Sequence, residues 1–397
     1  MKPKLAVIVT HPIQHFAPVY QALAQSDNVD IFVVYLCDAG AKTYFDKQFN
    51  TSVAWDVDLL SGYKHEVIRP GVGEVPKGFL KTDAPEIWQI LNREKPDAVL
   101  IYGYTRLVNW RAWLWANLNR KRVLYCSDSV LHRKRSKWKL WLKSFVLPYF
   151  FRGVDTFLVS GDCNAEYFRY YKVPPSRMVT CPLPVDVSRL RKNDAMDLPS
   201  LRRRVRDDLT INSEDFVVMI CGKMYPGKRP FDLLEAIINL RRNGMPVLGL
   251  FVGSGVLLDG LKAVAAERGQ AAAFRFTGFV NQSSLSSYYA AADLLALTSS
   301  EDAHPLVATE ATVFGLPLVL SSEVGCIGPN DVGRQGFNSF VYECGNIDAL
   351  AECIRVLYSS EELQQRMSRA SLEISSTQDV SVVAEVIEKV LLLDRQH

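Results

Sequence analysis

Short apolar runs alternate with longer amphipathic stretches along this chain, and the alternation predicts its architecture. Residues 5–9, 31–36, 98–102, 122–126, 156–159, 216–221, 247–252, 274–277, 294–298 and 317–321 form the apolar runs that we interpret as strands. Intervening segments such as 230–243, 257–268 and 284–292 have the periodicity of helices. Strands that are apolar on both faces are typical of parallel sheets covered by helices.

A change of pattern near the middle of the chain predicts two domains. Apolar periodicity gives way over residues 187–210 to polar and basic residues, and we interpret this segment as a linker. The chain of 397 residues can hold two ordinary cores. We therefore expect an α/β fold with two doubly wound, Rossmann-like domains facing a cleft. Their expected bounds are residues 1–190 and 210–375, and residues 376–397 should contain a helix that packs back on the first domain. Ligands of such sheets bind at the carboxyl ends of the strands.

The composition of the chain indicates the cellular compartment in which the protein works. A hydrophobic content of 48% with 22% charged residues is that of a globular protein. Eight scattered cysteines without a CxxC pair indicate small buried side chains in a reducing compartment. Neither a signal peptide nor an apolar run of spanning length is evident. We expect a cytoplasmic protein, with peripheral contact to the inner face of the cell membrane as a further option.

Two lysines follow the strand predicted at residues 216–221. Lys223 comes directly after Gly222, and Lys228 lies where the next helix begins. Glycine allows close approach of a ligand, and a helix N-terminus adds partial positive charge and N–H groups. Two ammonium groups can stabilise a diphosphate leaving group without a metal. A solvated basic loop is the alternative interpretation.

Two carboxylates follow the strand predicted at residues 294–298. Glu310 lies in an otherwise apolar helical stretch, so its side chain needs partners. A ribose diol would suit it, whereas a core Arg or a backbone N–H is the structural alternative. Asp302 precedes that helix and suits either sugar hydroxyls or a helix N-cap. The sequence thus predicts a nucleotide-sugar site.

Ordered motifs in the second half make a resemblance specific. They are Gly222-Lys223, Lys228, Gly253-Ser254-Gly255, Phe276-Thr277-Gly278-Phe279-Val280, Tyr288-Tyr289-Ala290-Ala291-Ala292-Asp293, Asp302-x7-Glu310 and Gly315-Leu316-Pro317. Over residues 214–360 the chain resembles the retaining glycosyltransferases of family 4, which have the GT-B fold and include enzymes of bacterial surface-polysaccharide synthesis.

The resemblance implies a role for each matching residue. Lys223 and Lys228 would hold the diphosphate of a UDP- or GDP-sugar, and Glu310 would hold its ribose. The donor sugar would be held by Asp302 and by the backbone of Ala303, His304, Pro305, Leu306 and Val307. Gly253 and Gly255 would lie in the neighbouring turn, and Phe279 and Val280 would contact the base. Retention at the anomeric carbon, no metal and no cofactor are likewise implied. Asp302 replaces the family's usual Glu and Lys223 its usual Arg, which shifts donor preference in our interpretation.

The first half offers candidates for binding an acceptor or a phosphate. His11, Gln14 and His15 crowd the loop after the first predicted strand, where a packing role is the alternative. Asp128 is the only acid among twelve Lys and Arg between Arg106 and Arg152, so it can contact the acceptor or pair with these cations. No catalytic base is assigned.

Residues 132–151 mix cations with Trp and Leu. Such a stretch can lie at an anionic membrane, which would fit a glycan or lipid-linked acceptor. A cationic helix packed on its own sheet is the alternative, and no nucleic-acid-binding motif accompanies the charge.

These observations predict a metal-independent, retaining glycosyltransferase that acts on a glycan or lipid-linked acceptor in polysaccharide or glycolipid synthesis. A two-domain sugar-nucleotide epimerase and a non-catalytic nucleotide- or glycan-binding protein remain alternatives. We set aside the DxD pair Asp56 and Asp58 as a strand or turn pair. We also set aside the partial dinucleotide fingerprint at Gly253, because Leu258 replaces its third glycine.

Overall fold

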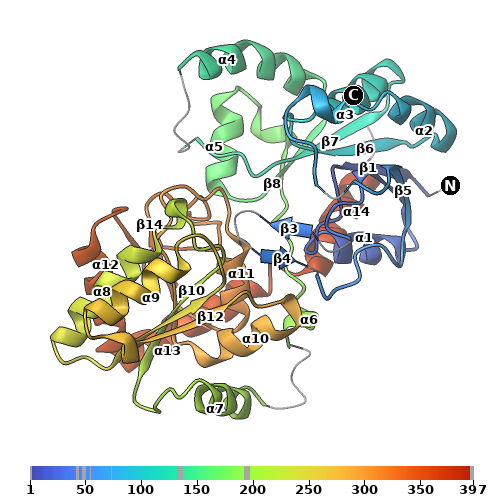
Figure 1. Ribbon diagram of the computed structural model, residues 1–397. Coiled ribbons are helices and arrows are strands. Elements are labelled where there is room, and N and C mark those ends of the chain that lie inside the picture. The colour runs from blue at the N-terminus through green and yellow to red at the C-terminus, as the bar shows by residue number, and fades with distance from the viewer. Residues whose placement is uncertain are drawn as a thin grey trace. The chain divides into compact units, whose positions relative to one another are not determined.

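The computed structural model describes residues 2–41, 44–46, 51–53, 55–72, 74–131, 137–191 and 197–393. The chain divides into two compact units (Figure 1). The first unit comprises Met1–Tyr44, Val57–Pro184 and Gln378–His397, and the second comprises Phe45–Asp56 and Val185–Thr377. Each unit is built around its own parallel sheet.

The first unit has a seven-stranded sheet in the order β5-β2-β1-β6-β7-β8-β9, with every pairing parallel. The strands are β1 (Lys4–Val9), β2 (Asp30–Cys37), β5 (Lys64–Arg69), β6 (Ala98–Tyr102), β7 (Arg122–Cys126), β8 (Thr156–Val159) and β9 (Met178–Thr180). Chain order reverses between β1 and β6, which makes this pair the topological switch point.

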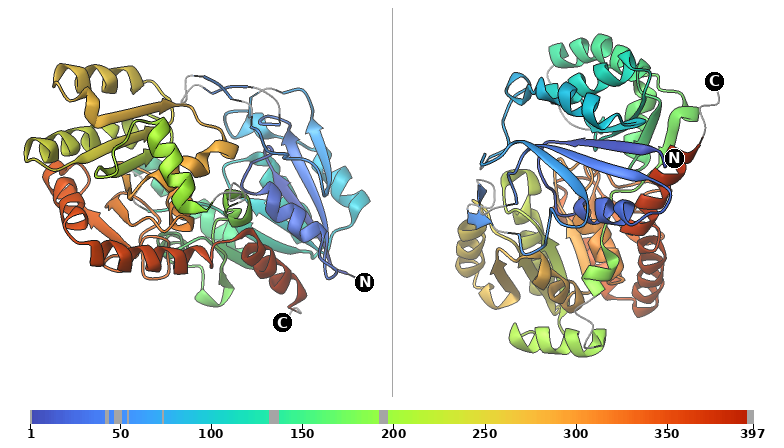
Figure 2. Two further views of the ribbon diagram at one scale, coloured as in Figure 1. Left: turned by 90° about the horizontal axis from the view of Figure 1, so that it is seen from below. Right: turned by 90° about the vertical axis from the view of Figure 1, so that its right-hand side faces the viewer.

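Helices cover both faces of that sheet because its strands alternate between two cores. The helices are α1 (Ala17–Ala24), α2 (Glu86–Glu94), α3 (Leu107–Leu118), α4 (Lys137–Arg152), α5 (Asp162–Tyr170) and α14 (Val380–Leu392). In β1, Ala6 and Ile8 pack with α2 to α5, whereas Leu5, Val7 and Val9 pack with α1 and α14. Figure 2 shows α14 running beside α1.

The guanidinium of Arg122, at the start of β7, fixes the end of α14. It donates hydrogen bonds to the backbone carbonyls of Val390 at 2.7 Å and of Leu391 and Leu393 at 3.1 Å. A cation near the last carbonyls of a helix satisfies groups that have no partner within the helix and complements the helix dipole. The C-terminal helix is thereby joined to β7, a central strand of the first unit's sheet.

The second unit has a six-stranded parallel sheet in the order β12-β11-β10-β13-β14-β15. The strands are β10 (Phe216–Cys221), β11 (Val247–Val252), β12 (Phe274–Gly278), β13 (Leu294–Leu297), β14 (Leu318–Ser321) and β15 (Ser339–Tyr342). Here the switch point lies between β10 and β13. A separate two-stranded sheet pairs β3 (Tyr44–Asp46) with β4 (Thr51–Val53).

Helices also cover both faces of the second sheet. They are α6 (Val187–Arg191), α7 (Leu198–Asp208), α8 (Pro230–Arg242), α9 (Leu258–Glu267), α10 (Gln282–Ala291), α11 (Leu306–Val313), α12 (Ile347–Tyr358) and α13 (Glu361–Ser375). One core joins α8, α9 and α12 to the sheet, and the other joins α10 and α11 to the opposite face.

All ten predicted strands are present, within one residue at each end. The prediction missed the edge strands β5, β9 and β15, whose residues are largely half-buried and carry no continuous apolar run. It also placed Phe45–Asp56 in the first domain, whereas this segment belongs to the second unit.

The linker prediction over residues 187–210 is wrong. Helices α6 and α7 occupy its described part, and both belong to the second unit. In α7, Arg206 donates to Asp293 at 2.7 Å, to the Ala291 carbonyl at 3.0 Å and to the Asp215 carbonyl at 3.2 Å, while Arg202 pairs with the same Asp293. These arginines face inward toward partners, so a basic stretch that suggested a solvated connection is part of the packed unit. The boundary falls after Pro184.

Candidate functional site

The loops that leave β10 and β13 lie against each other at the switch point of the second sheet. Lys223 and Lys228 lie on the first loop and Asp302 on the second. The Ser300 amide donates to the Gly227 carbonyl at 2.8 Å, and the Thr298 hydroxyl donates to the Lys228 carbonyl at 2.7 Å. These bonds hold the Lys228 turn against the loop that carries Asp302.

Lys228 and Asp302 form an ion pair between these two loops. The ammonium donates to Asp302 Oδ2, and the two side chains are only 18% and 17% exposed. An ammonium group has three N–H donors. Asp302 accepts from one of them, so Lys228 can bind an anion while it remains paired. The pair therefore places a cation next to a carboxylate that can accept a hydrogen bond from a hydroxyl group.

Glu310 is buried on α11, and its partner is a tyrosine hydroxyl. Tyr289 of α10 donates to Glu310 Oε2 at 2.7 Å. Burial raises the pKa of Glu310 above its usual value, while the Tyr289 hydrogen bond and the charge of Arg189 act in the opposite direction. The structural alternative was a hydrogen bond from a core Arg or a backbone N–H. Within the described residues, neither is among the hydrogen bonds of the Glu310 carboxylate. Tyr289 belongs to one of the motifs that carry the resemblance, but no role is predicted for it, since a buried tyrosine in a helix is usually a core residue.

The pKa of the Cys221 thiol, at the last residue of β10, is shifted by the charges of both Glu310 and Lys228. Burial and the charge of Glu310 raise the pKa of Cys221 to about 12, against a hydrogen bond with Tyr289 and the charge of Lys228. Glu310 and Lys228 therefore both lie within electrostatic range of the carboxyl end of β10. The structure thus groups Lys228, Asp302 and Glu310 around that strand end.

Glycines allow the loops after β10 and β11 to pack together. A Cβ atom on Gly253 would lie 1.9 Å from the Gly222 carbonyl oxygen, and one on Gly255 would lie 2.4 Å from that of Met224. Both glycines have positive φ angles, +132° and +156°. This close packing accounts for the Gly-x-Gly pattern by itself, and ligand contact at these positions stays a prediction.

Two features at the start of α11 bear on the predicted sugar contacts. Asp302 does not cap the helix, because α11 begins at Leu306 with Pro305 in the N-cap position and no side-chain cap. Instead, Asp302 joins a bridge to Val324, and its carbonyl accepts from the Gly325 amide at 2.8 Å. The His304 side chain is buried and lies 3.1 Å from Asp331, so only its backbone remains a candidate for sugar binding.

The expected base-binding residues lie on the loop after β12. The Phe279 ring is tilted against the Trp55 ring with centroids 6.3 Å apart. Val280 packs on the core beneath α10 and α11. Asp56 accepts a hydrogen bond from the Ser283 amide at 3.1 Å, at the start of α10. No pattern in the sequence predicts that Trp55 is a neighbour of Phe279, because the two residues are far apart in the chain.

The other carboxylate of the DxD pair closes a local turn. Asp58 accepts from the amides of Leu60 and Ser61, each at 3.1 Å. Among the described residues, no group of three or more His, Cys, Asp or Glu is arranged to hold a metal.

In the first unit, His11 and His15 lie near the switch point between β1 and β6. Burial, followed by the charge of Arg106, lowers the pKa of His11 to about 4. Burial, followed by His11, lowers the pKa of His15 to about 3. Both rings are therefore neutral near pH 7 and can serve a ligand as hydrogen-bonding groups rather than as cations. Arg106, which follows β6, supplies a positive charge that the sequence analysis did not single out.

Gln14 is half-buried in the same loop as the histidines, and Asp128 is exposed after β7. The positions of both residues suit ligand contact, which stays a prediction. Residues 132–136 of the basic stretch lie outside the described residues, whereas Lys137–Arg152 form α4. No helix in the described parts of the chain has the length and apolarity needed to cross a membrane.

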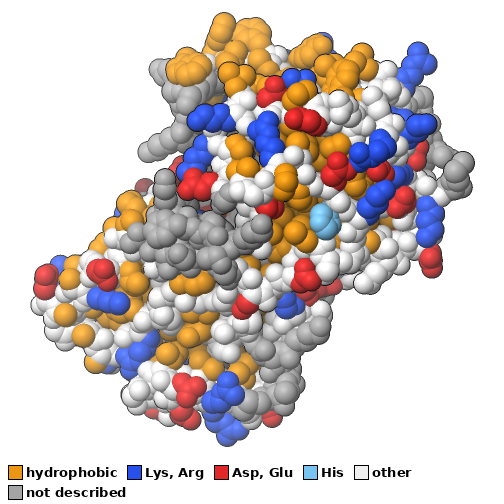
Figure 3. Space-filling model, turned by 45° about the vertical axis from the view of Figure 1, so that its right-hand side comes forward, with side chains coloured by type: hydrophobic (Ala, Val, Ile, Leu, Met, Phe, Trp, Pro, Cys, Tyr) orange, Lys and Arg blue, Asp and Glu red, His pale blue; other side chains and the backbone are white. Residues whose placement is uncertain are grey.

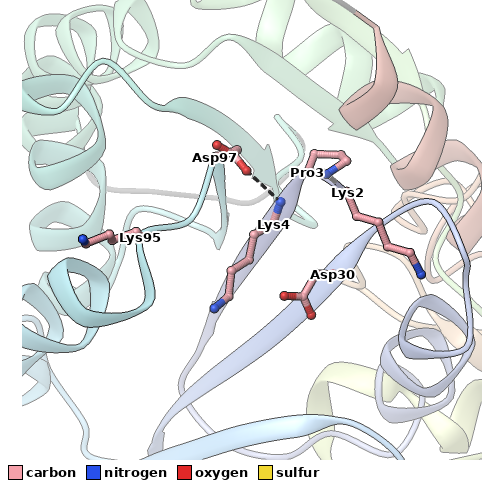
Figure 4. Close-up of a pocket in the computed structure, with 6 residues that line it drawn as sticks. All are labelled: Lys2, Pro3, Lys4, Asp30, Lys95 and Asp97. Atoms are coloured by element: carbon pink, nitrogen blue, oxygen red, sulfur yellow. Dashed lines mark hydrogen bonds between the residues drawn. The ribbon is translucent and has the colours of Figure 1, made fainter.

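A pocket elsewhere in the first unit is not a rival site. Figure 4 shows its lining residues at the amino ends of β1 and β2, which is the edge opposite to the one where ligands of such sheets bind. The lining residues are Lys2, Pro3, Lys4, Asp30, Lys95 and Asp97. Two of its charged side chains are engaged with protein: Asp97 accepts from the Lys4 amide at 2.9 Å, and the Lys4 ammonium donates to Glu94 at 2.6 Å.

Comparison with protein families gives a match that covers most of the second unit. Residues 202–373 match the family described as Glycosyl transferases group 1. The D-inositol 3-phosphate glycosyltransferase of Streptomyces griseus is 29% identical over 225 residues, which cover 52% of this chain and 46% of the relative. The same-named protein of Mycobacterium marinum is 30% identical over 227 residues, covering 56% and 47%. The chain spans about half the length of the curated relatives it matches.

Solved structures resemble almost the whole chain. Anabaena HepE, solved with UDP, has a TM-score of 0.70 at 17% identity, over 98% of this chain and 99% of that one. The same protein has been solved with UDP-glucose. Sucrose-phosphate synthase from Thermosynechococcus elongatus has a TM-score of 0.71 at 15% identity and covers 98% of both chains. This likeness assigns the GT-B fold and confirms the predicted fold class.

Proposed function

Residues 202–373 form a Glycosyl transferases group 1 domain, and from that premise we propose that the chain is a glycosyltransferase that uses a nucleotide-diphosphate sugar as donor. The Lys228–Asp302 pair carries the proposal. It joins the loops after β10 and β13, the two strands of the switch point, where ligands of doubly wound sheets bind.

Charge and hydrogen-bonding capacity at this point suit an activated sugar. Lys228 offers N–H donors to a diphosphate, and Lys223 brings a second ammonium group to the same loop. Asp302 offers a carboxylate to sugar hydroxyls. The first amides of α11 have no partner within the helix and add donors next to it.

Glu310 suits the ribose of the nucleotide. A buried carboxylate needs hydrogen-bond donors, and Tyr289 supplies one. The two hydroxyls of a ribose would supply others, and the carboxylate would in turn select a ribonucleotide. UDP is the first nucleotide to test, because HepE has been solved with UDP and with UDP-glucose.

The chemistry proposed for the transfer step is metal-independent and retaining. Negative charge grows on the diphosphate as the glycosidic bond to the donor breaks, and the two ammonium groups neutralise it. The acceptor is a glycan or lipid-linked sugar of polysaccharide or glycolipid synthesis, received by the first unit near His11 and Arg106. The neutral His11 ring would accept or donate one hydrogen bond to an acceptor hydroxyl.

A donor screen followed by a transfer assay tests the proposal. Thermal shift with a panel of nucleotide sugars identifies the donor, and mass spectrometry then follows sugar transfer and free nucleotide. Lys228→Gln removes the charge but keeps a donor for Asp302, and it should abolish transfer in a folded protein. Lys262→Gln, an exposed lysine on α9, is the matched control.

Three outcomes would contradict the proposal. Unchanged turnover of the Lys228→Gln variant would show that the Lys228–Asp302 ion pair has no role in sugar transfer. A product that has the mass of the donor and forms without an acceptor would indicate an epimerase. Calorimetric binding of a donor with no nucleotide release under any acceptor would indicate a binding protein.

A further inference from the structure

Helix α4 of the first unit is apolar on two opposite faces. Its inner face packs into the core through Leu147, Phe150 and Phe151, each no more than 1% exposed. Large apolar side chains also point outward, with Trp138, Trp141, Phe145 and Tyr149 each 63–66% exposed. A helix at the surface of a globular protein normally carries polar residues on its outer face.

The outward aromatic side chains form one stripe. They are spaced three, four and four residues apart, which places them along a single helical face. The rings of Trp141 and Phe145 have centroids 5.1 Å apart. Leu142 and Val146, which are 47% and 37% exposed, widen the stripe. Hydrophobic side chains gather along the upper edge of Figure 3, the edge at which Figure 1 places α4.

Cations accompany the stripe, and acids are absent from it. The helix sequence has Lys137, Lys139, Lys143 and Arg152 but no Asp or Glu. Lys143 is engaged with the body of the unit, because its ammonium donates to the Tyr104 hydroxyl at 2.6 Å. In the sequence, the remaining cations stand in the first three residues and at the last residue of the helix, so the segment that carries the stripe has basic residues at both ends.

We propose that the outer face of α4, which comprises Trp138, Trp141, Leu142, Phe145, Val146 and Tyr149, lies in the headgroup region of an anionic membrane. Trp and Tyr prefer the boundary between lipid headgroups and acyl chains, and Leu, Phe and Val gain by burial there. Lysine and arginine at the helix ends are attracted to anionic lipids. A second copy of this face would bring like charges together, whereas an anionic surface complements them. The inference goes beyond the proposed function, because it rests on α4 alone and not on transfer.

Vesicle flotation of the full chain tests the proposal directly. Wild-type protein should float with vesicles of phosphatidylcholine mixed with phosphatidylglycerol at low salt, and less with phosphatidylcholine alone or at high salt. Trp141→Ser with Phe145→Ser should weaken binding about tenfold or more, since each side chain loses the gain from apolar burial. Lys137→Gln should weaken binding about fivefold, the value for one cation near an anionic surface. Phe337→Ser, at a 40% exposed phenylalanine of the second unit, should change nothing.

Two further measurements keep the test sharp. Thermal unfolding and UDP binding of each variant check the fold and the second unit, and both should match the wild type. Sedimentation velocity without vesicles should show the same mass for the wild type and the stripe variant. The proposal is overturned if the wild type fails to float with anionic vesicles at low salt, or if the stripe variant floats as well as the wild type. A wild-type dimer that the stripe substitutions dissociate would also overturn it, by assigning the face to contact between copies.

Discussion

Replacement of Glu310 by Gln tests the proposed ribose contact with little change in shape. Gln keeps a carbonyl oxygen that can accept from Tyr289, which donates to the Glu310 carboxylate at 2.7 Å. It removes the negative charge and the cost of burying that charge. The variant should therefore fold with stability equal to or above that of the wild type.

Nucleotide binding should nevertheless fall. A hydrogen bond to a charged acceptor contributes about 1.5–3 kcal/mol, which corresponds to a loss of about 10- to 150-fold in affinity for UDP when the charge is removed. Tyr289→Phe is the matched control. It leaves Glu310 buried without its hydroxyl donor and should cost about 1–3 kcal/mol of folding stability.

Isothermal calorimetry with UDP and denaturant unfolding, each over a range of pH, measure these effects. Because the pKa of Glu310 is raised in the folded chain, the folded state holds this proton at pH values where the unfolded state has released it. This contribution to stability is present below the ordinary pKa of Glu and is lost as the pH rises through the raised value. Glu310→Gln should abolish that loss. UDP affinity of the wild type should drop as the pH falls through the raised pKa, and that of the variant should stay flat.

Equal affinity of the wild type and Glu310→Gln for UDP at neutral pH would refute the reasoning. So would a variant less stable than Tyr289→Phe, because the burial argument requires the neutral amide to be the better tolerated change.

Three further predictions concern the two units. Gly253→Ala should destabilise the second unit by about 2 kcal/mol or more in denaturant unfolding, because its Cβ would collide with the Gly222 carbonyl. Gly269→Ala is the control, since Gly269 has a positive φ but open space around it, and this change should cost only about 1 kcal/mol. Burial lowers the pKa of His15 from 6.5 to about 3, so the unfolded chain binds the extra proton between these values and stability falls as the pH drops through that window. His15→Leu should flatten this slope by up to about 1.4 kcal/mol per pH unit, and an unchanged slope would show that His15 is not buried. Arg206→Ala should lower the free energy of unfolding by about 3–5 kcal/mol, because it removes this arginine from the nearly buried Asp293. Thermal or denaturant unfolding measures the change. A loss below about 1 kcal/mol would indicate that α7 is a linker and not part of the packed unit.

The central strands could be predicted because their sequences have a single interpretation. β10 and β11 are buried at every position, so six consecutive apolar residues identify each of them. Edge strands have no such signature. β5 contains Lys64, His65, Glu66 and Arg69 and is only half-buried beyond its first residue, so its sequence does not differ from that of a loop.

The candidate site could be predicted only where chemistry is tied to position in the sequence. Lys228 and Asp302 each follow a strand, and strands that adjoin in a doubly wound sheet bring such residues together. The hydrogen bond from Tyr289 to Glu310 depends on the packing of α10 on α11, which no local pattern encodes. Asp302 has the residue type of an N-cap, yet the helix starts four residues later because Pro305 takes that position. Residue type alone therefore does not decide between a capping and a binding role.

The position of α14 has a consequence for how the protein is made. Val383, Ile387 and Val390 of this helix complete the core beneath β1 and β2, whereas the sheet and helices of the second unit end with α13. During synthesis the ribosome therefore delivers every strand and helix of the second unit before the piece that closes the first. The face of β1 and β2 that α1 covers only in part must therefore wait for α14 until the second unit has been translated, which makes the nascent first unit the part of this protein most in need of a chaperone.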